Sequence, residues 1–132
     1  MLVVDDQRHF RLIERAILRG FGVRKIYEAG DAISALEVMR GQDLDVALID
    51  LEMPTIDGVE LINLIRGDHS LTNREIPIIV ISAHARKSRV EESIAAGASS
   101  FLVKPVSVST IFQRITNVVD IDRAAGRGEQ AG

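Results

Sequence analysis

The chain has 132 residues, of which 46% are hydrophobic and 27% charged, a composition typical of one ordinary globular domain. Its 16 basic and 19 acidic residues leave a formal net charge of −3, which excludes an overall basic field directed at nucleic acid or a membrane surface. Cysteine is absent, so disulfides and thiolate chemistry are excluded, and we expect a cytoplasmic protein. We expect neither a transmembrane helix nor a signal peptide, because the apolar runs are far shorter than roughly 20 residues and the N-terminus carries no basic segment.

Strand and helix patterns alternate five times along the chain. Each strand is a short apolar run, and each helix repeats apolar residues every three or four positions. The expected strands are residues 2–4, 23–28, 46–50, 78–81 and 101–103, and the expected helices are residues 7–20, 31–41, 58–66, 86–96 and 107–120. We expect residues 1–121 to form one domain and residues 122–132, which are small and polar, to be a disordered tail.

Apolar spacing also predicts which face three of the helices bury. In the first helix Phe10, Ile13 and Ile17 share a face opposite a stripe of arginines. In the fourth helix the apolar face is little more than Val90 and Ile94. In the last helix it comprises Val108, Ile111, Phe112, Ile115 and Val119.

Five strand-then-helix units predict an α/β fold. Strands that are apolar along their whole length belong in a parallel sheet covered by helices on both faces. We therefore expect a doubly wound, flavodoxin-like domain with a five-stranded parallel sheet in the order 2-1-3-4-5 and five helices. A solenoid is disfavoured because the units share no sequence period.

Four of the five strands end in a group able to bind phosphate or metal. These groups are Asp5 with Asp6, then Asp50, Ser82 and Lys104. The carboxyl ends of parallel strands lie on one edge of the sheet, so we expect these side chains to converge there.

Phosphoryl transfer is the chemistry that these residue types suit. The three aspartates offer the oxygen ligands that Mg²⁺ prefers, and the metal would offset the repulsion among them. Asp50 can act as a carboxylate nucleophile that forms an aspartyl phosphate, while Lys104 and Ser82 can contact phosphoryl oxygens. Taken singly, each aspartate or serine could equally be a helix cap or strand terminator, but that alternative does not explain a lysine followed by proline at the fifth strand end.

These motifs together resemble the receiver domain of two-component response regulators. The resemblance rests on Asp5-Asp6, Asp50-x-x-Met53-Pro54-x-x-x-Gly58, Ser82-Ala83 and Lys104-Pro105, and it extends over about residues 1–121. The resemblance is to the stand-alone, single-domain type typified by the chemotaxis response regulator, and we expect either such a stand-alone receiver or a piece of a larger protein. This resemblance implies a signalling domain rather than an ordinary enzyme, one that assists its own phosphotransfer and autodephosphorylation.

The resemblance also implies a role for each motif residue. Asp50 would be phosphorylated by a sensor histidine kinase or a histidine phosphotransferase. Asp5 or Asp6, Asp50 and the backbone carbonyl of Glu52 would hold Mg²⁺. Ser82 and Lys104 would contact the phosphoryl group, and the Lys104–Pro105 peptide bond would be cis.

A conformational switch is implied as well. Phosphorylation would draw the Ser82 hydroxyl inward and Phe101 would turn in behind it, reshaping the surface of helix four, strand five and helix five, where a downstream protein would bind. Without a hydroxyl of its own, Phe101 could equally be a plain core aromatic. Dimerisation through helices four and five stays open.

Three further features are particular to this sequence. Glu52 and His84 lie two residues beyond Asp50 and Ser82, at positions that would tune the lifetime of the phosphoryl group, or they are solvated loop residues. The arginine stripe of the first helix, including Arg11 and Arg15, is either a solvated face or a docking surface for the kinase or phosphotransferase. Cations at the start of helix four indicate either an acidic partner or a plain solvated helix end; they are Arg86, Lys87 and Arg89.

Rival functions are weaker. A haloacid-dehalogenase-like phosphatase would need a second aspartate where Glu52 stands, and nucleotide-binding glycine loops are absent from the sequence. A pseudo-receiver that only binds partners is the remaining alternative, and the complete set of acids, hydroxyl and lysine disfavours it. We expect no direct contact with nucleic acid or membrane.

Overall fold

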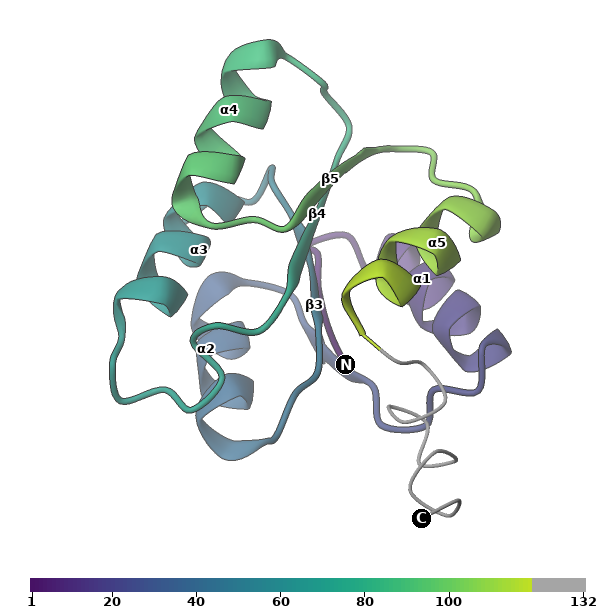
Figure 1. Ribbon diagram of the computed structural model, residues 1–132, viewed down its shortest axis with the longest axis horizontal. Helices are drawn as coiled ribbons and strands as arrows, with labels where there is room; N and C mark the ends of the chain where they lie inside the picture. Colours follow the sequence, from purple (N-terminus) through teal and green to yellow (C-terminus); the bar gives the residue numbers. More distant parts are fainter. Residues whose placement is uncertain (120–132) are drawn as a thin grey trace.

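The computed structural model describes residues 1–119, in which strands and helices alternate five times (Figure 1). Residues 120 and 121 of the expected domain, and the expected tail at 122–132, lie outside the described residues. The elements are β1 (Leu2–Val4), α1 (Arg8–Gly20), β2 (Tyr27–Ala29), α2 (Ala32–Gly41), β3 (Ala47–Asp50), α3 (Gly58–Gly67), β4 (Ile78–Ser82), α4 (Lys87–Ala96), β5 (Ser100–Val103) and α5 (Val108–Val118).

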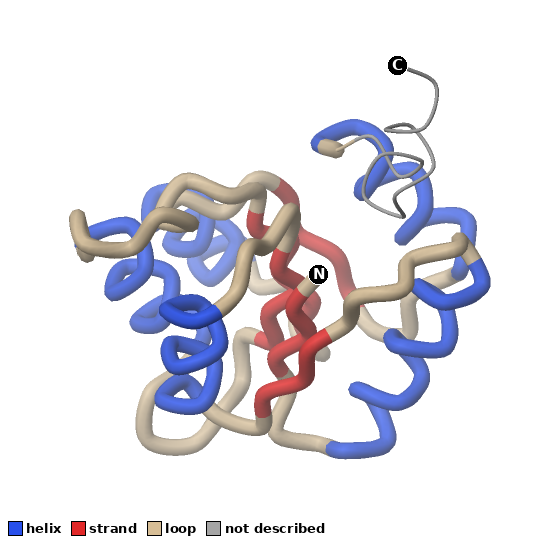
Figure 2. The backbone as a smooth tube through the Cα atoms, turned by 90° about the horizontal axis from the view of Figure 1, so that it is seen from below, coloured by secondary structure: helices blue, strands red, loops and turns tan. Residues whose placement is uncertain are grey.

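All strand pairs are parallel, and the sheet has the order β2-β1-β3-β4-β5, which confirms the expected fold. Helices α2, α3 and α4 cover one face of the sheet, and α1 and α5 cover the other (Figure 1). Viewed from below, the strands form a central layer between the two groups of helices (Figure 2). No helix within residues 1–119 is long and apolar enough to cross a membrane.

Alternating side chains of the strands supply two separate cores. Val4, Ile49 and Val80 belong to the core beneath α2, α3 and α4, whereas Leu48 and Ile81 belong to the core beneath α1 and α5. Successive residues of a strand point to opposite faces, so a strand covered on both sides must be apolar throughout. The continuous apolar runs of the sequence follow from this.

Register places the strand ends beside one another. Val4 of β1 pairs with Ile49 of β3, so the next residues, Asp5 and Asp50, emerge together. In the same way Ser82 of β4 pairs with Val103 of β5, immediately before Lys104.

Strand β2 is shorter than the expected strand over residues 23–28 and begins four residues further along the chain, at Tyr27. It pairs only with β1, from Leu2 with Tyr27 to Val4 with Ala29, and β1 has just three residues to offer. Val23 instead turns inward, and its N–H donates to the Leu18 carbonyl at 3.1 Å. The apolar residues before Tyr27 therefore extend the core without extending the sheet.

The expected face of α1, made of Phe10, Ile13 and Ile17, was right only in part, since Ile17 packs partly buried against the core beneath α1 and α5. Glu14 and Leu18, one turn apart, are its buried residues, and Ile13 is 51% exposed. A carboxylate is an unfavourable residue to bury, so apolar spacing gives no reason to expect Glu14 on the inner face.

Two other helices also depart from the expected faces. Helix α4 buries Ser93 instead of Ile94, which is 49% exposed, because the Ser93 hydroxyl donates to the Arg89 carbonyl at 2.7 Å and so needs no water. Helix α5 buries Ile111 and Ile115 as expected. However, Val108 and Phe112 are 53% and 45% exposed.

Candidate functional site

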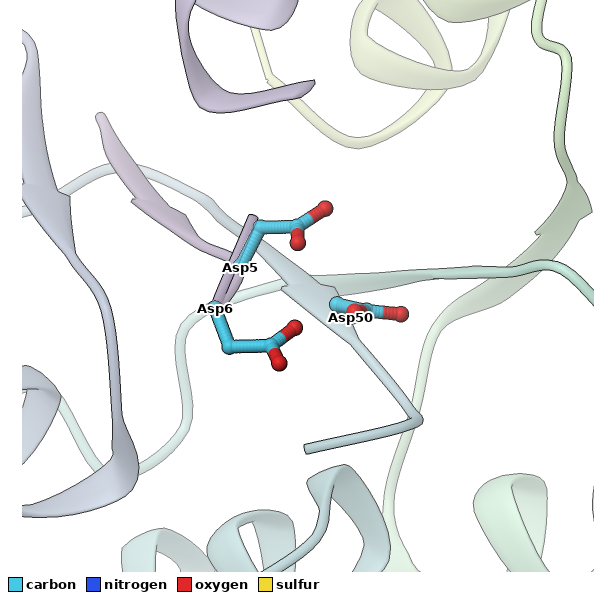
Figure 3. A group of neighbouring side chains, drawn as sticks. All are labelled: Asp5, Asp6 and Asp50. Carbon is cyan, nitrogen blue, oxygen red and sulfur yellow. The ribbon is translucent and has the colours of Figure 1, made fainter. Parts of the chain in front are cut away.

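The three aspartates predicted to bind metal come together at the carboxyl edge of the sheet. Asp5 and Asp6 follow β1, Asp50 ends β3, and their carboxyl groups point in the same direction (Figure 3). One carboxylate oxygen from each lies within 4.8 Å of the others. Asp5 and Asp50 are buried and Asp6 is exposed, so the cluster has one open side. This donor set fits Mg²⁺, which takes carboxylate oxygens and keeps several waters.

Asp50 is the most perturbed member of the cluster. Burial, followed by the charge of Asp5, raises the pKa of Asp50 to about 7, against the opposing effect of Lys104. Both causes disfavour the charged form of the carboxyl group. A cation bound among the aspartates would remove much of this penalty and favour the carboxylate.

A short and tightly constrained loop presents Asp50. A Cβ atom at Gly58 would lie 2.7 Å from the Asp50 carbonyl oxygen and 2.8 Å from Leu51 Cα, so only glycine allows this approach. Asp57 then caps α3 by accepting the Glu60 N–H at 3.0 Å. The Glu52 N–H donates to Asp50 Oδ1 at 3.3 Å, which orients the carboxyl group.

Lys104 crosses from β5 to the aspartates. Its Nζ donates to Asp5 Oδ2 at 2.9 Å, lies 3.7 Å from Asp50 Oδ1, and stands 4.0 Å from the centre of the Phe10 ring. Burial opposes the charge, but the hydrogen bond to Asp5 and the charge of Asp50 raise the pKa of Lys104, which stays protonated. The Lys104–Pro105 peptide bond is cis, the isomer implied by the resemblance.

Ser82, at the end of β4, is fully buried and already engaged. Its hydroxyl donates to a carboxylate oxygen of Glu52, in a short contact, and Ser82 Oγ accepts the His84 N–H at 3.1 Å. The other Glu52 oxygen accepts the Ala83 N–H at 3.4 Å. Glu52 therefore joins the β3–α3 loop to the β4–α4 loop, while His84 takes part through its backbone and is otherwise exposed.

Arg11 and Arg15 are paired within the chain and are not a free stripe. Arg11 donates from Nε to Glu28 at 3.2 Å and from Nη1 to the Asp5 carbonyl oxygen at 2.6 Å, and Arg15 donates to Glu28 at 2.7 Å. A Cβ at Gly30 would lie 3.3 Å from Arg11 Nη1, so glycine leaves room for this guanidinium. Arg11 therefore links the Glu28 side chain of β2 to the backbone at Asp5.

Two acidic residues of this region were missed by sequence reasoning. Glu28 lies in β2, and Glu14 faces the inside of α1. No pattern marked Glu28, which ends an expected strand that also carries Arg24 and Lys25, whereas Glu14 stands four residues from both Phe10 and Leu18. That spacing places these three side chains on one side of the helix.

The remaining predicted residues lie farther from the aspartates. Phe101, in β5, is partly buried against the core beneath α2, α3 and α4. Arg89 forms ion pairs with Asp57 at 3.3 Å and with Glu92 at 2.9 Å, so its charge is largely neutralised by acidic residues of the same chain. Arg86 and Lys87 are exposed.

Comparison with known proteins gives concordant matches. A family model described as the response regulator receiver domain matches residues 1–116. The chain is 30% identical over 120 residues to chemotaxis protein CheY-3 of Vibrio cholerae, with 91% of each covered. It is 28% identical to chemotaxis protein CheY of Pseudomonas aeruginosa, over 91% of this chain and 95% of that one.

Solved structures match in the same way. Vibrio cholerae CheY4 aligns with a TM-score of 0.81 and 26% identity, covering 89% of this chain and 96% of its own. The receiver domain of the sensor histidine kinase PA1611 from Pseudomonas aeruginosa PAO1 aligns with a TM-score of 0.75 and 29% identity, covering 95% of each. That structure has a magnesium ion coordinated in its active-site cleft.

Proposed function

The chain belongs to the response regulator receiver domain family, and from this premise we propose that it is a phosphoacceptor signalling domain in which Asp50 receives the phosphoryl group. The observation that supports this most is the convergence of Asp5, Asp6, Asp50 and Lys104 at one edge of the sheet. A lysine beside a buried carboxyl group, next to a candidate metal site, suits attack on a phosphoryl group.

The transfer forms one bond and breaks one bond. A carboxylate oxygen of Asp50 attacks the phosphorus of a phosphohistidine on a sensor kinase or histidine phosphotransferase, and the phosphorus–nitrogen bond breaks as the aspartyl phosphate forms. Asp5, Asp6, Asp50 and the backbone carbonyl of Glu52 would hold Mg²⁺. When bound, this ion would neutralise charge on the phosphoryl oxygens. Lys104 would pair with one phosphoryl oxygen and Ser82 would donate to another.

Glu52 must release Ser82 before the hydroxyl can serve the phosphoryl group. The Glu52 carboxylate accepts hydrogen bonds from both the Ser82 hydroxyl and the Ala83 N–H. These two groups, at the end of β4, are donors that the phosphoryl group on Asp50 would also use. Glu52 would therefore compete with the phosphoryl group and set its lifetime, together with His84. Phe101 would follow Ser82 and alter the surface of α4, β5 and α5, where a downstream protein binds.

The setting proposed for this chemistry is a cytoplasmic two-component pathway. A pseudo-receiver, which would use the same fold only to bind partners, is the alternative against which the proposal is tested. The raised pKa of Asp50 and the pairing of Lys104 with Asp5 favour chemistry, because a purely adhesive domain has no need of buried and mutually repelling carboxyl groups.

Intact mass spectrometry after incubation with Mg²⁺ and acetyl phosphate tests this function. We expect the protein to gain one phosphoryl group, and the Asp50→Asn variant to gain none. A control with EDTA in place of Mg²⁺ should also show no gain. Absence of the added mass in a protein that binds Mg²⁺ would contradict the proposal and favour the pseudo-receiver.

A further inference from the structure

A cavity lies behind Lys104, on the side of the sheet covered by α1 and α5. It measures about 100 Å³ and its walls are mainly apolar, from Phe10, Ile13 and Ile17 of α1, Ile81 of β4 and Ile111 of α5. The stretch from Lys104 to Val106 closes it on the side of the aspartates. Of its lining residues, Ile81 and Ile111 are almost fully buried, whereas Ile13 is half-exposed, so the cavity is open to solvent at Ile13.

Glu14 is the acidic residue in the wall of this cavity. It is 7% exposed, and within residues 1–119 its Oε2 atom is buried without a hydrogen-bond partner. Burial is the main cause that raises the pKa of Glu14 to about 8, and the charge of Asp5 adds to it while Lys104 opposes it. Glu14 is therefore mostly an uncharged carboxylic acid at neutral pH. It can accept or donate one hydrogen bond that the fold itself does not supply.

Water is a poor hydrogen-bond partner for the Glu14 carboxyl group in this cavity. A buried water needs two to four polar partners. Among the residues within 1–119 that line the cavity, only Glu14 and Lys104 have polar side chains, and the Lys104 ammonium is engaged by Asp5. An engineered apolar cavity of about 150 Å³ binds benzene. This cavity is smaller, at about 100 Å³, but it is open at Ile13, so a ring need not lie entirely inside it. The cavity thus combines a surface for one small ring with a single unsatisfied polar atom.

We propose that this cavity is a binding site for a small monocyclic molecule that is mainly apolar and donates one N–H or O–H hydrogen bond to Glu14. The ring would lie against Phe10, Ile81 and Ile111, and its polar atom would meet Glu14 Oε2. Such a ligand would also touch the aliphatic stem of Lys104, so its binding would reach the lysine that faces Asp50. The site is separate from phosphoryl transfer, and the proposal holds whether or not Asp50 is phosphorylated.

Aniline and toluene form a matched pair of probes, because they share a ring and differ in an amino or methyl group. Each is titrated into the full chain labelled at Ile and Val methyl groups, and binding is followed at Ile81, Ile111 and Val106. We expect saturable shifts at these methyls, with aniline bound about three- to tenfold more tightly than toluene because of one hydrogen bond. The Lys104 methylene signals should move with them.

Two variants test the part played by Glu14. Glu14→Gln keeps a hydrogen-bonding group and should keep most of the preference for aniline, whereas Glu14→Met should bind both probes equally. Dispersion of the amide spectrum checks that each variant folds, and the comparison of the two probes in the parent chain needs neither variant. Equal affinity of the parent for aniline and toluene, or no saturable shift at the cavity methyls with either probe, would overturn the proposal.

Discussion

The two sides of Asp50 are built differently. On the lysine flank, made of Lys104, Asp5 and Phe10, the Lys104 and Asp5 side chains are 12% and 1% exposed, and their charged groups pair at 2.9 Å. On the hydroxyl flank, made of Ser82, Ala83 and Glu52, the serine is buried but Ala83 is exposed and Glu52 is half-buried. In both flanks, a carboxylate of the chain already holds a group that a phosphoryl group would use.

This difference indicates which flank can move. Lys104 is held by a buried ion pair at the end of the sheet, and breaking such a pair leaves an uncompensated charge. Ser82 is held by Glu52, a half-buried residue of the β3–α3 loop, and without Glu52 its hydroxyl can still donate to the His84 carbonyl oxygen at 2.9 Å, so releasing it costs little. We therefore predict that the lysine flank sets charge and stability, and that under the proposed function the hydroxyl flank is the side that responds to phosphorylation.

The largest effect is expected from Lys104→Met. It leaves Asp5 and Asp50 without their cation, and we expect the free energy of unfolding to fall by about 3 kcal/mol in EDTA, with part of the loss restored by Mg²⁺. Urea unfolding in EDTA measures the loss of stability, and urea unfolding with Mg²⁺ measures how much of it the metal restores. Lys87→Met is the control, since Lys87 is 90% exposed and its loose contact with Glu91 spans 3.8 Å. Equal stability of Lys104→Met and the parent would remove the distinction between the flanks.

Magnesium affinity should depend on pH through Asp50. Because its pKa is raised to about 7, the proton must leave before a metal binds, so apparent affinity should fall by up to about tenfold per pH unit below pH 7 and level off above it. The same raised pKa means that the metal-free fold loses stability as the pH rises from about 4 to about 7. Calorimetric titration at several pH values checks the first statement, and a flat profile between pH 5.5 and 8 would refute it. Asp50→Asn should flatten the profile.

Arg11 and Arg15 offer a matched test of how the lysine flank is positioned. Both pair with Glu28, but only Arg11 also donates to the Asp5 carbonyl. We expect Arg11→Ala to weaken Mg²⁺ binding about fivefold, the effect of one hydrogen bond, and Arg15→Ala to change it less than twofold. Equal weakening by both variants would show that the ion pair, not the contact with Asp5, is what matters.

The pairing of these arginines also changes how docking is tested. Charge reversal at Arg11 would disturb Asp5 as well as any surface offered to a kinase. Arg8 and Arg19 are exposed on the same helix and are the better positions for that experiment.

The smallest effect is expected on the hydroxyl flank. Glu52→Gln keeps the shape of the side chain but removes its charge, so Ser82 and Ala83 are released more readily to a phosphoryl group. The lifetime of the phosphorylated protein should lengthen by a few fold, as measured by the decay of the added mass. Glu60→Gln, on the exposed side of α3, should leave the lifetime unchanged. A shortened lifetime in Glu52→Gln would mean that Glu52 protects the phosphoryl group rather than competing with it.

The fold could be predicted because its signals are local. Continuous apolar runs ended by polar residues define strands buried on both faces, and a parallel sheet then gathers Asp5, Asp50, Ser82 and Lys104 at one edge. These features depend on sequence order and strand register alone, so no knowledge of side-chain packing was needed.

The details that failed depend on contacts between distant residues. Arg11 meets Glu28 across 17 positions and Ser82 meets Glu52 across 30, and nothing in the local pattern of either residue specifies its partner. Apolar spacing gave no reason to bury Glu14, because burial of an acid is rare, or Ser93, because a buried hydroxyl needs an acceptor that only the folded helix provides. In each case a polar group is buried, so hydrophobic periodicity misplaces it.

Binding of a phosphoryl analogue tests the central claim most directly. Amide spectra of the protein with Mg²⁺ would be recorded as beryllofluoride, which mimics a phosphoryl group on aspartate, is added. We predict saturable shifts at Asp50 and on both flanks, at Lys104 and Ala83, with the larger change at Ala83, and no shift in Asp50→Asn. Spectra that respond to Mg²⁺ but stay unchanged with beryllofluoride would contradict the assignment of Asp50 as the phosphoacceptor.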